Sequence, residues 1–460
     1  MKSRLVLGLL LIFWLYTPVN AVEWFEPEKI PCENRFLINL AVDNTGVCWC
    51  EGWPWMYSYR NDEQGWQPEI ELDSIHWGTP CFDKSNVLWL LRENSDISYT
   101  RYNGQTWSEV DSVPVYPSWN SRATYTADSS GGVWVAWNTD WWFYWVVAYN
   151  RYSNGSWDEP RPLTDTMNLK DDRLYSMSTD ALGRVWVGWY PLAVSYYDGN
   201  DWSEKEIIST VAGTELDLSP DREGGMWALW DRVDTTASPL VWRYYILASH
   251  WNGMIWSHPD TVAFTGRFAQ GAKPYGNIAV DAEGNAWAVW RQAITEPYDV
   301  YGDIYYSVNT GSGWSEPAPV NEHPAKDIIP DIAVDGEGRV WCVWGSNREG
   351  EDEYDYSIWA SYTKPSGVEE PVTPATPQPI LTVDKGIGSS FTFRVSNLNS
   401  PAQISIYDAS GKKVRILPVN SDVVTWDGRD KHGVKQASGV YFVRFTTNEY
   451  QTSRKMVLVK

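Results

Sequence analysis

The sequence predicts an all-β protein: a seven-bladed β-propeller closed by its N-terminal strand, followed by a small C-terminal antiparallel β-sandwich. Three observations lead to this expectation. A short turn-and-strand pattern recurs seven times along the 460 residues. The start of the mature chain matches the one strand that the last repeat lacks. Composition and charge change abruptly after a proline-rich segment. Self-similarity at a roughly constant period is typical of repeat folds.

Residues 1–21 have the pattern of a secretory signal peptide, with cleavage expected after Ala21. Two basic residues precede an apolar run of 12 residues, and small residues occupy the positions that a signal peptidase reads. This run is too short to cross a bilayer, and no later run approaches the roughly 20 apolar residues of a transmembrane helix. We therefore expect an exported protein, secreted or attached to the cell surface, without a transmembrane segment.

The repeat has the form Asp-x-x-Gly/Asn-x-x-Trp, and in five copies a second tryptophan follows three residues later. The seven copies begin at Asp43, Asp83, Asp128, Asp180, Asp221, Asp281 and Asp335. Each copy joins two short apolar strands, and two more strands rich in Tyr, Ser and Trp follow it. Four short strands at a period of 40–60 residues are typical of a propeller blade.

The repeated aspartates are predicted to shape turns rather than to catalyse a reaction. At the first position of a tight turn, a carboxylate can accept backbone N–H groups, and the glycine three residues later can adopt a positive φ. A catalytic acid is not usually needed in seven copies. The repeated tryptophans are likewise expected to pack between blades, where they bury much apolar area.

The seventh repeat ends without a recognisable fourth strand. The N-terminal segment "EWFEPEKI" matches the fourth-strand segments "GWSEPAPV" and "SWDEPRPL". We therefore predict that the N-terminal strand completes the last blade of a propeller that spans residues 22–367. Such closure removes two exposed sheet edges.

The C-terminal part has a different composition. Residues 368–379 contain four prolines and are expected to form an extended linker. Residues 380–460 carry a net charge of +6, whereas residues 22–379 carry −30. Alternating runs such as "FTFRV" and "GVYFVRF" predict a small antiparallel β-sandwich in this part.

Two segments of the tail resemble known families. "ISIYDASGKKVRIL" and "WDGRDKHGVKQASGVYFVRF" resemble the C-terminal sorting domains of type IX secretion cargo and the immunoglobulin-like module of flagellar hook-capping proteins. The resemblance is carried by Trp426, Asp427, Gly428, Asp430, Gly439 and Tyr441. It implies that the tail engages the outer-membrane secretion machinery. The propeller repeat resembles NHL-like and two-component-regulator propellers.

Long insertions are expected as loops on the face opposite the repeated aspartate turns, where propeller ligands usually bind. They include "NTDWWFYW" after Trp137, which we call the aromatic loop, and the stretch from His258 to Asn277. Loop variation on a rigid scaffold often carries function. Exposed aromatic rings beside carboxylates suit sugar binding, although the aromatic loop can instead fold back and bury its rings. The candidate ligand-binding residues are Trp141, Trp142, Tyr144, Asp299, Asp303, Asp352 and Asp355.

These features favour a surface protein that binds a glycan or another protein. The acidic body argues against nucleic acid as a partner, because nucleic acid needs basic patches. No HExxH or GxSxG motif is present, so catalysis has little support. A glycosidase or lyase and a purely structural protein are the alternatives. No cofactor is expected: the acidic stretch at 349–355 offers oxygen ligands for Ca²⁺ but lacks EF-hand spacing.

Overall fold

The computed structural model divides the chain into two compact units, residues 1–366 and 367–460. The predicted signal peptide and the predicted linker lie outside the described residues. The structure describes residues 22–31, 38–52, 55–59, 65–72, 78–93, 96–141, 144–164, 172–211, 213–236, 241–269, 272–293, 302–350, 355–363, 380–383, 387–396, 402–408, 412–419, 421, 423–447 and 451–459.

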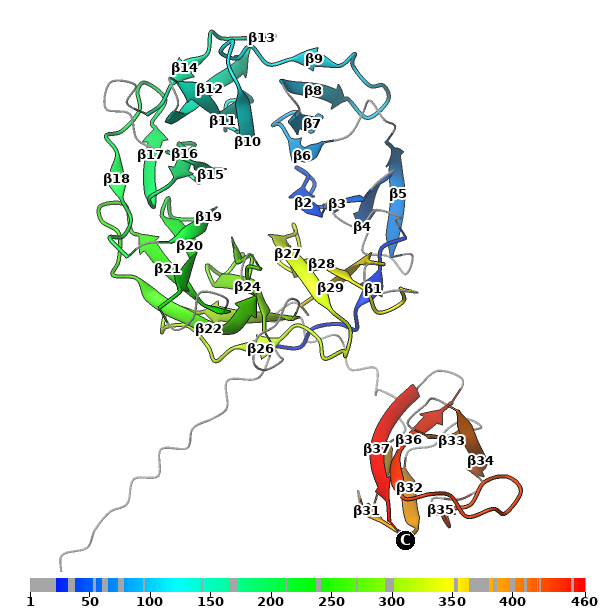
Figure 1. Cartoon of the computed structure of the whole chain (residues 1–460). Coiled ribbons are helices and arrows are strands. Elements are labelled where there is room, and N and C mark those ends of the chain that lie inside the picture. The colour runs from blue at the N-terminus through cyan, green and yellow to red at the C-terminus, as the bar shows by residue number, and fades with distance from the viewer. Residues whose placement is uncertain are drawn as a thin grey trace, which may run out of the picture. The chain divides into compact units, whose positions relative to one another are not determined.

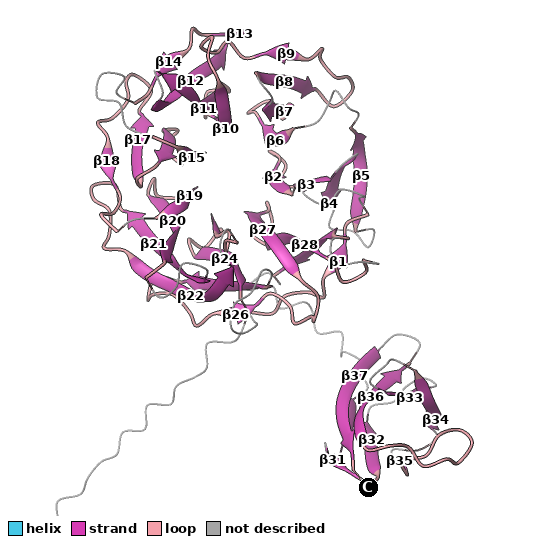
Figure 2. Cartoon of the chain, in the orientation of Figure 1, coloured by secondary structure: helices cyan, strands magenta, loops and turns pink. Residues whose placement is uncertain are grey.

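The strands of the first unit form seven sheets around a ring (Figure 1). Within each sheet, antiparallel neighbours mostly follow one another along the chain, and the first strand of each sheet lies nearest the centre of the ring. The described part of the chain contains no helix (Figure 2). The propeller class predicted from the repeat is therefore confirmed, and each of the seven sheets contains one copy of the repeat.

The first sheet contains β2 (Asn39–Val42), β3 (Cys48–Gly52), β4 (Trp55–Tyr59) and β5 (Trp66–Glu71). The second contains β6 (Thr79–Phe82), β7 (Leu88–Glu93), β8 (Ile97–Tyr102) and β9 (Asp111–Ser112). The third contains β10 (Asn120–Ala127), β11 (Val133–Trp141), β12 (Tyr144–Ser153), β13 (Ser156–Trp157) and β14 (Arg161–Pro162). The fourth contains β15 (Leu174–Thr179), β16 (Val185–Trp189), β17 (Ala193–Tyr197) and β18 (Glu206–Ile207).

The fifth sheet contains β19 (Thr214–Pro220), β20 (Met226–Asp234), β21 (Val241–Trp251) and β22 (Asp260–Ala269). The sixth contains β23 (Asn277–Val280), β24 (Ala286–Gln292), β25 (Asp303–Asn309) and β26 (Ala318–Pro319). The seventh contains β27 (Asp327–Val334), β28 (Val340–Ser346), β29 (Ser357–Tyr362) and the N-terminal β1 (Glu28–Lys29).

The N-terminal strand closes the ring as predicted. β1 pairs antiparallel with β29, with Glu28 opposite Ala360. The pairing extends beyond β1, because Ile30 N–H donates to the Ile358 carbonyl at 2.9 Å and Phe25 N–H donates to the Tyr362 carbonyl at 2.9 Å. The N-terminal segment thus supplies the outer strand that the seventh repeat lacks, and it covers what would otherwise be an open sheet edge.

The repeated tryptophans fill the space between sheets. Trp186 of the fourth sheet is fully buried and meets Trp251 of the fifth sheet edge to face, with ring centroids 5.0 Å apart. Trp134 of the third sheet meets Trp202 of the fourth edge to face as well, with ring centroids 5.9 Å apart. Edge-to-face pairs of this kind add to the free energy gained from burial. The interfaces between neighbouring sheets are therefore largely aromatic.

The second unit is a sandwich of two sheets. One contains β30 (Ile380–Val383), β32 (Phe391–Ser396) and β35 (Val423–Trp426). The other contains β31 (Ile387–Gly388), β37 (Gln451–Leu458), β36 (Gly439–Thr446), β33 (Ala402–Asp408) and β34 (Lys413–Val419). The pairing is antiparallel except between β31 and β37, which run parallel.

The residues of the tail motif hold the turn after β35. Trp426 is fully buried and stacks on Phe391, and its indole N–H donates to the Arg429 carbonyl at 2.7 Å. One carboxylate oxygen of Asp430 accepts the N–H groups of His432 and Val434. The Tyr441 hydroxyl donates to the Ala437 carbonyl at 2.9 Å. The motif therefore ties one turn to the sandwich core.

Candidate functional site

The predicted aromatic insertion forms a long hairpin rather than a loop. β11 and β12 stay paired as far as Trp141 and Tyr144, which lie opposite each other at its tip. Pairing satisfies backbone groups that an irregular loop would leave to water. The predicted insertion after His258 is likewise largely strand, since β22 covers Asp260–Ala269. The expectation of irregular loops was wrong for these two segments.

The structure describes the side chains of three of the seven candidate ligand-binding residues. Tyr144, at the hairpin tip, is 46% exposed. Asp303 begins β25 of the sixth sheet, and Asp355 precedes β29 of the seventh. Trp142, Asp299, Asp352 and the side chain of Trp141 lie outside the described residues. The role of all seven residues as ligand contacts remains a prediction.

The repeated aspartates share one hydrogen-bonding arrangement. In all seven, one carboxylate oxygen accepts the backbone N–H groups of the residues two and four positions later. In six, the other oxygen accepts the indole N–H of the tryptophan six positions later. Asp221 differs, because its second oxygen contacts His250 Nε2 at 2.8 Å. These carboxylates are occupied by the turns that they stabilise.

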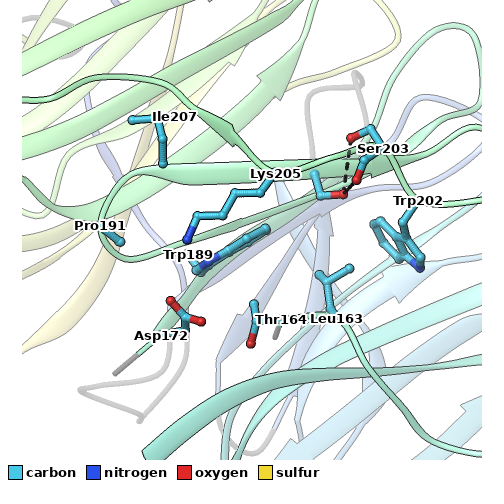
Figure 3. Close-up of a pocket in the computed structure, with 10 residues that line it drawn as sticks. Leu163, Thr164, Asp172, Trp189, Pro191, Trp202, Ser203, Lys205 and Ile207 are labelled. Carbon is cyan, nitrogen blue, oxygen red and sulfur yellow. Dashed lines mark hydrogen bonds between the residues drawn. The ribbon is translucent and has the colours of Figure 1, made fainter. Parts of the chain in front are cut away.

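A pocket of about 550 Å³ lies between the third and fourth sheets (Figure 3). Its volume falls in the range typical of small-ligand sites. We call it the inter-blade pocket. It is lined by Leu163, Thr164, Asp172, Trp189, Pro191, Ser195, Trp202, Ser203, Lys205 and Ile207.

The inter-blade pocket borders the β11–β12 hairpin. Asp172, which is 6% exposed, donates its backbone N–H to the Trp145 carbonyl at 3.1 Å. Its own carbonyl accepts a hydrogen bond from the Asn138 side-chain amide at 2.9 Å. Trp145 and Asn138 lie on the two strands of the hairpin. The backbone of Asp172 is therefore anchored to the hairpin that presents Tyr144 to solvent.

Charged groups flank an indole ring in this pocket. Lys205 Nζ lies 5.6 Å from the centroid of the Trp189 ring, a cation–π contact. In Figure 3 the Lys205 and Asp172 side chains lie on either side of the Trp189 indole. Trp189 is 2% exposed, and its indole N–H has no hydrogen-bond partner among the described residues. The corresponding indole of the third sheet, Trp137, donates to Asn120 at 3.0 Å.

The two serines of the pocket belong to the scaffold. Ser195 Oγ donates to the Ser203 carbonyl at 2.8 Å, and the hydroxyl pair is drawn in Figure 3. The same serine pair recurs between strands of the fifth and sixth sheets. Because the pairing repeats, these hydroxyls hold each sheet together.

Lys205 departs from the internal repeat. It stands three residues after Trp202, and the equivalent position is a proline in four of the other six sheets, namely Pro27, Pro160, Pro259 and Pro317. This departure is a signal in the sequence that could have singled out Lys205. Asp172 gives no comparable signal, because it lies 33 residues away on another segment and only the fold brings the two together. Sequence reasoning missed both residues.

The described residues offer no group of three or more His, Cys, Asp or Glu side chains placed to hold a metal ion. Nor do they include a helix that could span a membrane. What the inter-blade pocket provides instead is one carboxylate, one ammonium group, an unpaired indole N–H and apolar walls.

Residues 388–460 match the family described as the secretion system C-terminal sorting domain. The predicted resemblance of the tail to type IX secretion sorting domains is therefore confirmed. This domain marks export by type IX secretion, so the protein is secreted or attached to the cell surface. The role of the tail fits an interaction with the secretion machinery.

Among solved structures, the chain is similar to a fungal alcohol oxidase of the AA5 family, with 13% identity, coverage of 96% of this chain and 100% of that one, and a TM-score of 0.51. It is also similar to the extracellular domain of a hybrid two-component system from B. thetaiotaomicron (13% identity, 92% and 55% coverage, TM-score 0.45). A third similar structure is PorZ, a surface component of the type IX secretion system of Porphyromonas gingivalis. It has 13% identity, coverage of 92% of this chain and 66% of that one, and a TM-score of 0.37. At these identities the likeness concerns the fold alone. No curated protein matches the chain.

Proposed function

We propose that this exported protein binds a glycan at the cell surface and holds one sugar of it in the inter-blade pocket. The observation that carries the proposal is the placement of the Asp172 and Lys205 side chains on either side of the Trp189 indole in one pocket. Sugar hydroxyls donate to carboxylates and accept from ammonium groups, while apolar ring faces contact indoles. A pocket with mostly apolar walls and a few convergent polar groups is typical of small-ligand sites.

The hairpin beside the pocket extends the proposed site. Tyr144 is exposed at its tip, and Trp141 and Trp142 adjoin it in the sequence. An exposed ring can stack on a further sugar of the same chain. We propose these three aromatic residues as secondary contacts, with Asp172 and Lys205 as the primary ones.

Binding is favoured over hydrolysis by the composition of the pocket. Most glycosidases use a pair of carboxylic acids that flank the scissile bond. The described lining of the inter-blade pocket contains one carboxylate, that of Asp172. An enzyme that acts on polysaccharides is therefore the second candidate, and its readout is the release of soluble sugar.

The test uses the chain from residue 22 to residue 460 on an array of bacterial and plant polysaccharides. We expect saturable binding without sugar release. Lys205→Met should weaken binding about 10-fold or more, because it removes a charge-assisted hydrogen bond worth roughly 1.5–3 kcal/mol. Lys84→Met is the matched control, since Lys84 adjoins the Asp83 turn of another sheet. Equal binding by both variants would contradict the proposed site, and sugar release would favour the enzyme.

A further inference from the structure

Trp119 is the most exposed aromatic residue in the part of the chain that the structure describes, with 72% of its surface accessible. It precedes β10 of the third sheet, and hydrogen bonds hold its backbone in place. Its carbonyl accepts the Asp140 N–H at 2.9 Å, and the Ser118 hydroxyl donates to the Asp140 carbonyl at 2.6 Å. Single exposed rings are common on protein surfaces, so the neighbours of Trp119 decide whether it belongs to a site.

Trp119, Asp140 and Trp145 lie opposite one another across three neighbouring segments of the third sheet. Because Asn120 pairs with Thr139 in β11, the same register sets Trp119 opposite Asp140. Asp140 in turn pairs with Trp145 across the β11–β12 hairpin. Residues opposite each other in an antiparallel ladder carry their side chains on the same face of the sheet. The order is therefore indole, carboxylate, indole, and we call these three residues the aromatic row.

The aromatic row lies on the face of the third sheet that borders the inter-blade pocket. Ala136 of β11 and Val147 of β12 pack in one core cluster with Trp189, which lines the pocket. Side chains alternate between the two faces along a strand. Asp140 comes four positions after Ala136, and Trp145 comes two positions before Val147, so both share this face. Asp140 and Trp145 are partly exposed, and the row therefore continues the wall of the pocket towards solvent.

Backbone hydrogen bonds connect the aromatic row to the inter-blade pocket. Asp172, which lines the pocket, donates its N–H to the Trp145 carbonyl at 3.1 Å. Trp119, Asp140, Trp145 and Asp172 thus follow one another on adjacent backbone segments. Neighbouring strands lie about 4.8 Å apart, so the backbones of Trp119 and Asp172 are separated by about 14 Å. This separation exceeds the width of one sugar ring, so a ligand that reaches from the pocket to Trp119 must be a chain of sugars.

The chemistry of the aromatic row favours a sugar chain over a peptide. An indole face packs on the apolar C–H face of a sugar ring, and a carboxylate accepts hydrogen bonds from its hydroxyls. An extended proline-rich peptide also packs on aromatic rings. Proline has no N–H, however, so such a peptide presents mainly carbonyl acceptors, which the Asp140 carboxylate would repel. The carboxylate between the two indoles therefore distinguishes the two kinds of ligand.

We propose that the aromatic row binds successive sugars of a linear polysaccharide that also occupies the inter-blade pocket, so that the ligand is an extended sugar chain rather than a single sugar. This inference rests on the glycan-binding function proposed above. Trp119 and Trp145 stack on two rings of the chain, and Asp140 accepts hydrogen bonds from the hydroxyls between them. The affinity of the protein then depends on the length of the chain that it holds.

The test measures affinity against ligand length on the chain from residue 22 to residue 460. The probes run from disaccharides to octasaccharides of the cellulose, xylan, laminarin and pectin backbones. For at least one series we expect affinity to rise about 10-fold or more with length, because each further ring buries apolar area. Trp119→Ala should remove most of this rise without changing the affinity for the shortest probe that binds, whereas Trp119→Tyr should keep it. Phe264→Ala is the matched control, because Phe264 is 48% exposed on β22 of the fifth sheet.

The outcomes separate this inference from the proposed function. If affinity does not rise with length, or if Trp119→Ala keeps the rise, the aromatic row is not part of the site. The glycan-binding function would then stand as long as Lys205→Met still weakens binding of the shortest probe. Binding of polyproline that Trp119→Ala abolishes, with no oligosaccharide bound, would assign the row to a peptide and overturn the inference. If no probe binds, the inference is overturned, and if nothing on the wider array binds either, the proposed function fails with it.

Discussion

Both carboxylate oxygens of Asp180 accept hydrogen bonds from its own turn and from the strand that follows. One oxygen accepts the N–H groups of Leu182 and Arg184, and the other accepts the Trp186 indole N–H at 2.8 Å and the Arg184 guanidinium at 2.6 Å. The side chain has no exposed surface. Buried polar groups are costly when they lose their partners. The stability of the fourth sheet should therefore depend on this residue.

Asp180→Ala should lower the free energy of unfolding by about 3–5 kcal/mol, because it leaves a buried indole N–H and a guanidinium group without their acceptor. The measurement is urea denaturation followed by tryptophan fluorescence. Asp198→Ala is the control: Asp198 also accepts two backbone N–H groups in a turn, but it is exposed. We expect a loss of about 1 kcal/mol or less there. Similar losses in both variants would contradict the role assigned to burial.

Glu51 should make stability depend on pH. It is 2% exposed, and burial raises the pKa of its carboxyl from 4.5 to about 7. The folded state therefore holds a proton that the unfolded state releases, so its contribution is complete below about pH 4.5 and is lost as pH rises to about 7. Glu51→Gln should be more stable than the parent at pH 8 by on the order of 1–3 kcal/mol, and equal to it at pH 4. Urea denaturation at both pH values tests this, and an equal difference at both would refute it.

At the scale of the strands, the sequence predicts the scaffold better than the site. The Asp-x-x-Gly turn is local, so its seven copies locate the first two strands of every sheet. The hairpin around Trp141 was expected as a loop, because consecutive aromatic residues break the alternation that marks a half-buried strand. Pairing with the neighbouring strand outweighs that pattern. Asp172 precedes the first strand of the fourth sheet and Lys205 precedes its last strand, so only the folding of that sheet brings them to one pocket, which no local pattern encodes.

The internal repeat also suggests a substitution that tests the pocket with little disturbance of the backbone. Lys205→Pro gives the fourth sheet the residue that four other sheets carry at this position, so the backbone should accept it. We expect the free energy of unfolding to stay within about 1 kcal/mol of the parent, while glycan binding weakens as in Lys205→Met. Thermal denaturation and binding to the polysaccharide array are measured on the same preparation. A large loss of stability would show that Lys205 serves the scaffold rather than the ligand.

At the scale of the whole molecule, the N-terminal segment stabilises the ring where the first and seventh sheets meet. Ile30 is fully buried against the first and seventh sheets, and Trp24 packs on Trp287 and Tyr306 of the sixth. Ser361 donates its hydroxyl hydrogen to the Phe25 carbonyl at 2.6 Å. The N-terminal segment therefore contributes buried area as well as hydrogen bonds to the last sheet.

Removing residues 22–30 should consequently destabilise the propeller by on the order of 5 kcal/mol, since one buried isoleucine and several backbone hydrogen bonds are lost together. For a unit of this size we expect the Tm to fall by roughly 5–10 °C, with a tendency to aggregate, because β29 becomes an unpaired edge. The control is removal of residues 367–460, a separate compact unit. That deletion takes away far more of the chain, yet it should leave the Tm of the propeller nearly unchanged. If the longer deletion were the more damaging one, closure by the N-terminal strand would not be what stabilises the ring.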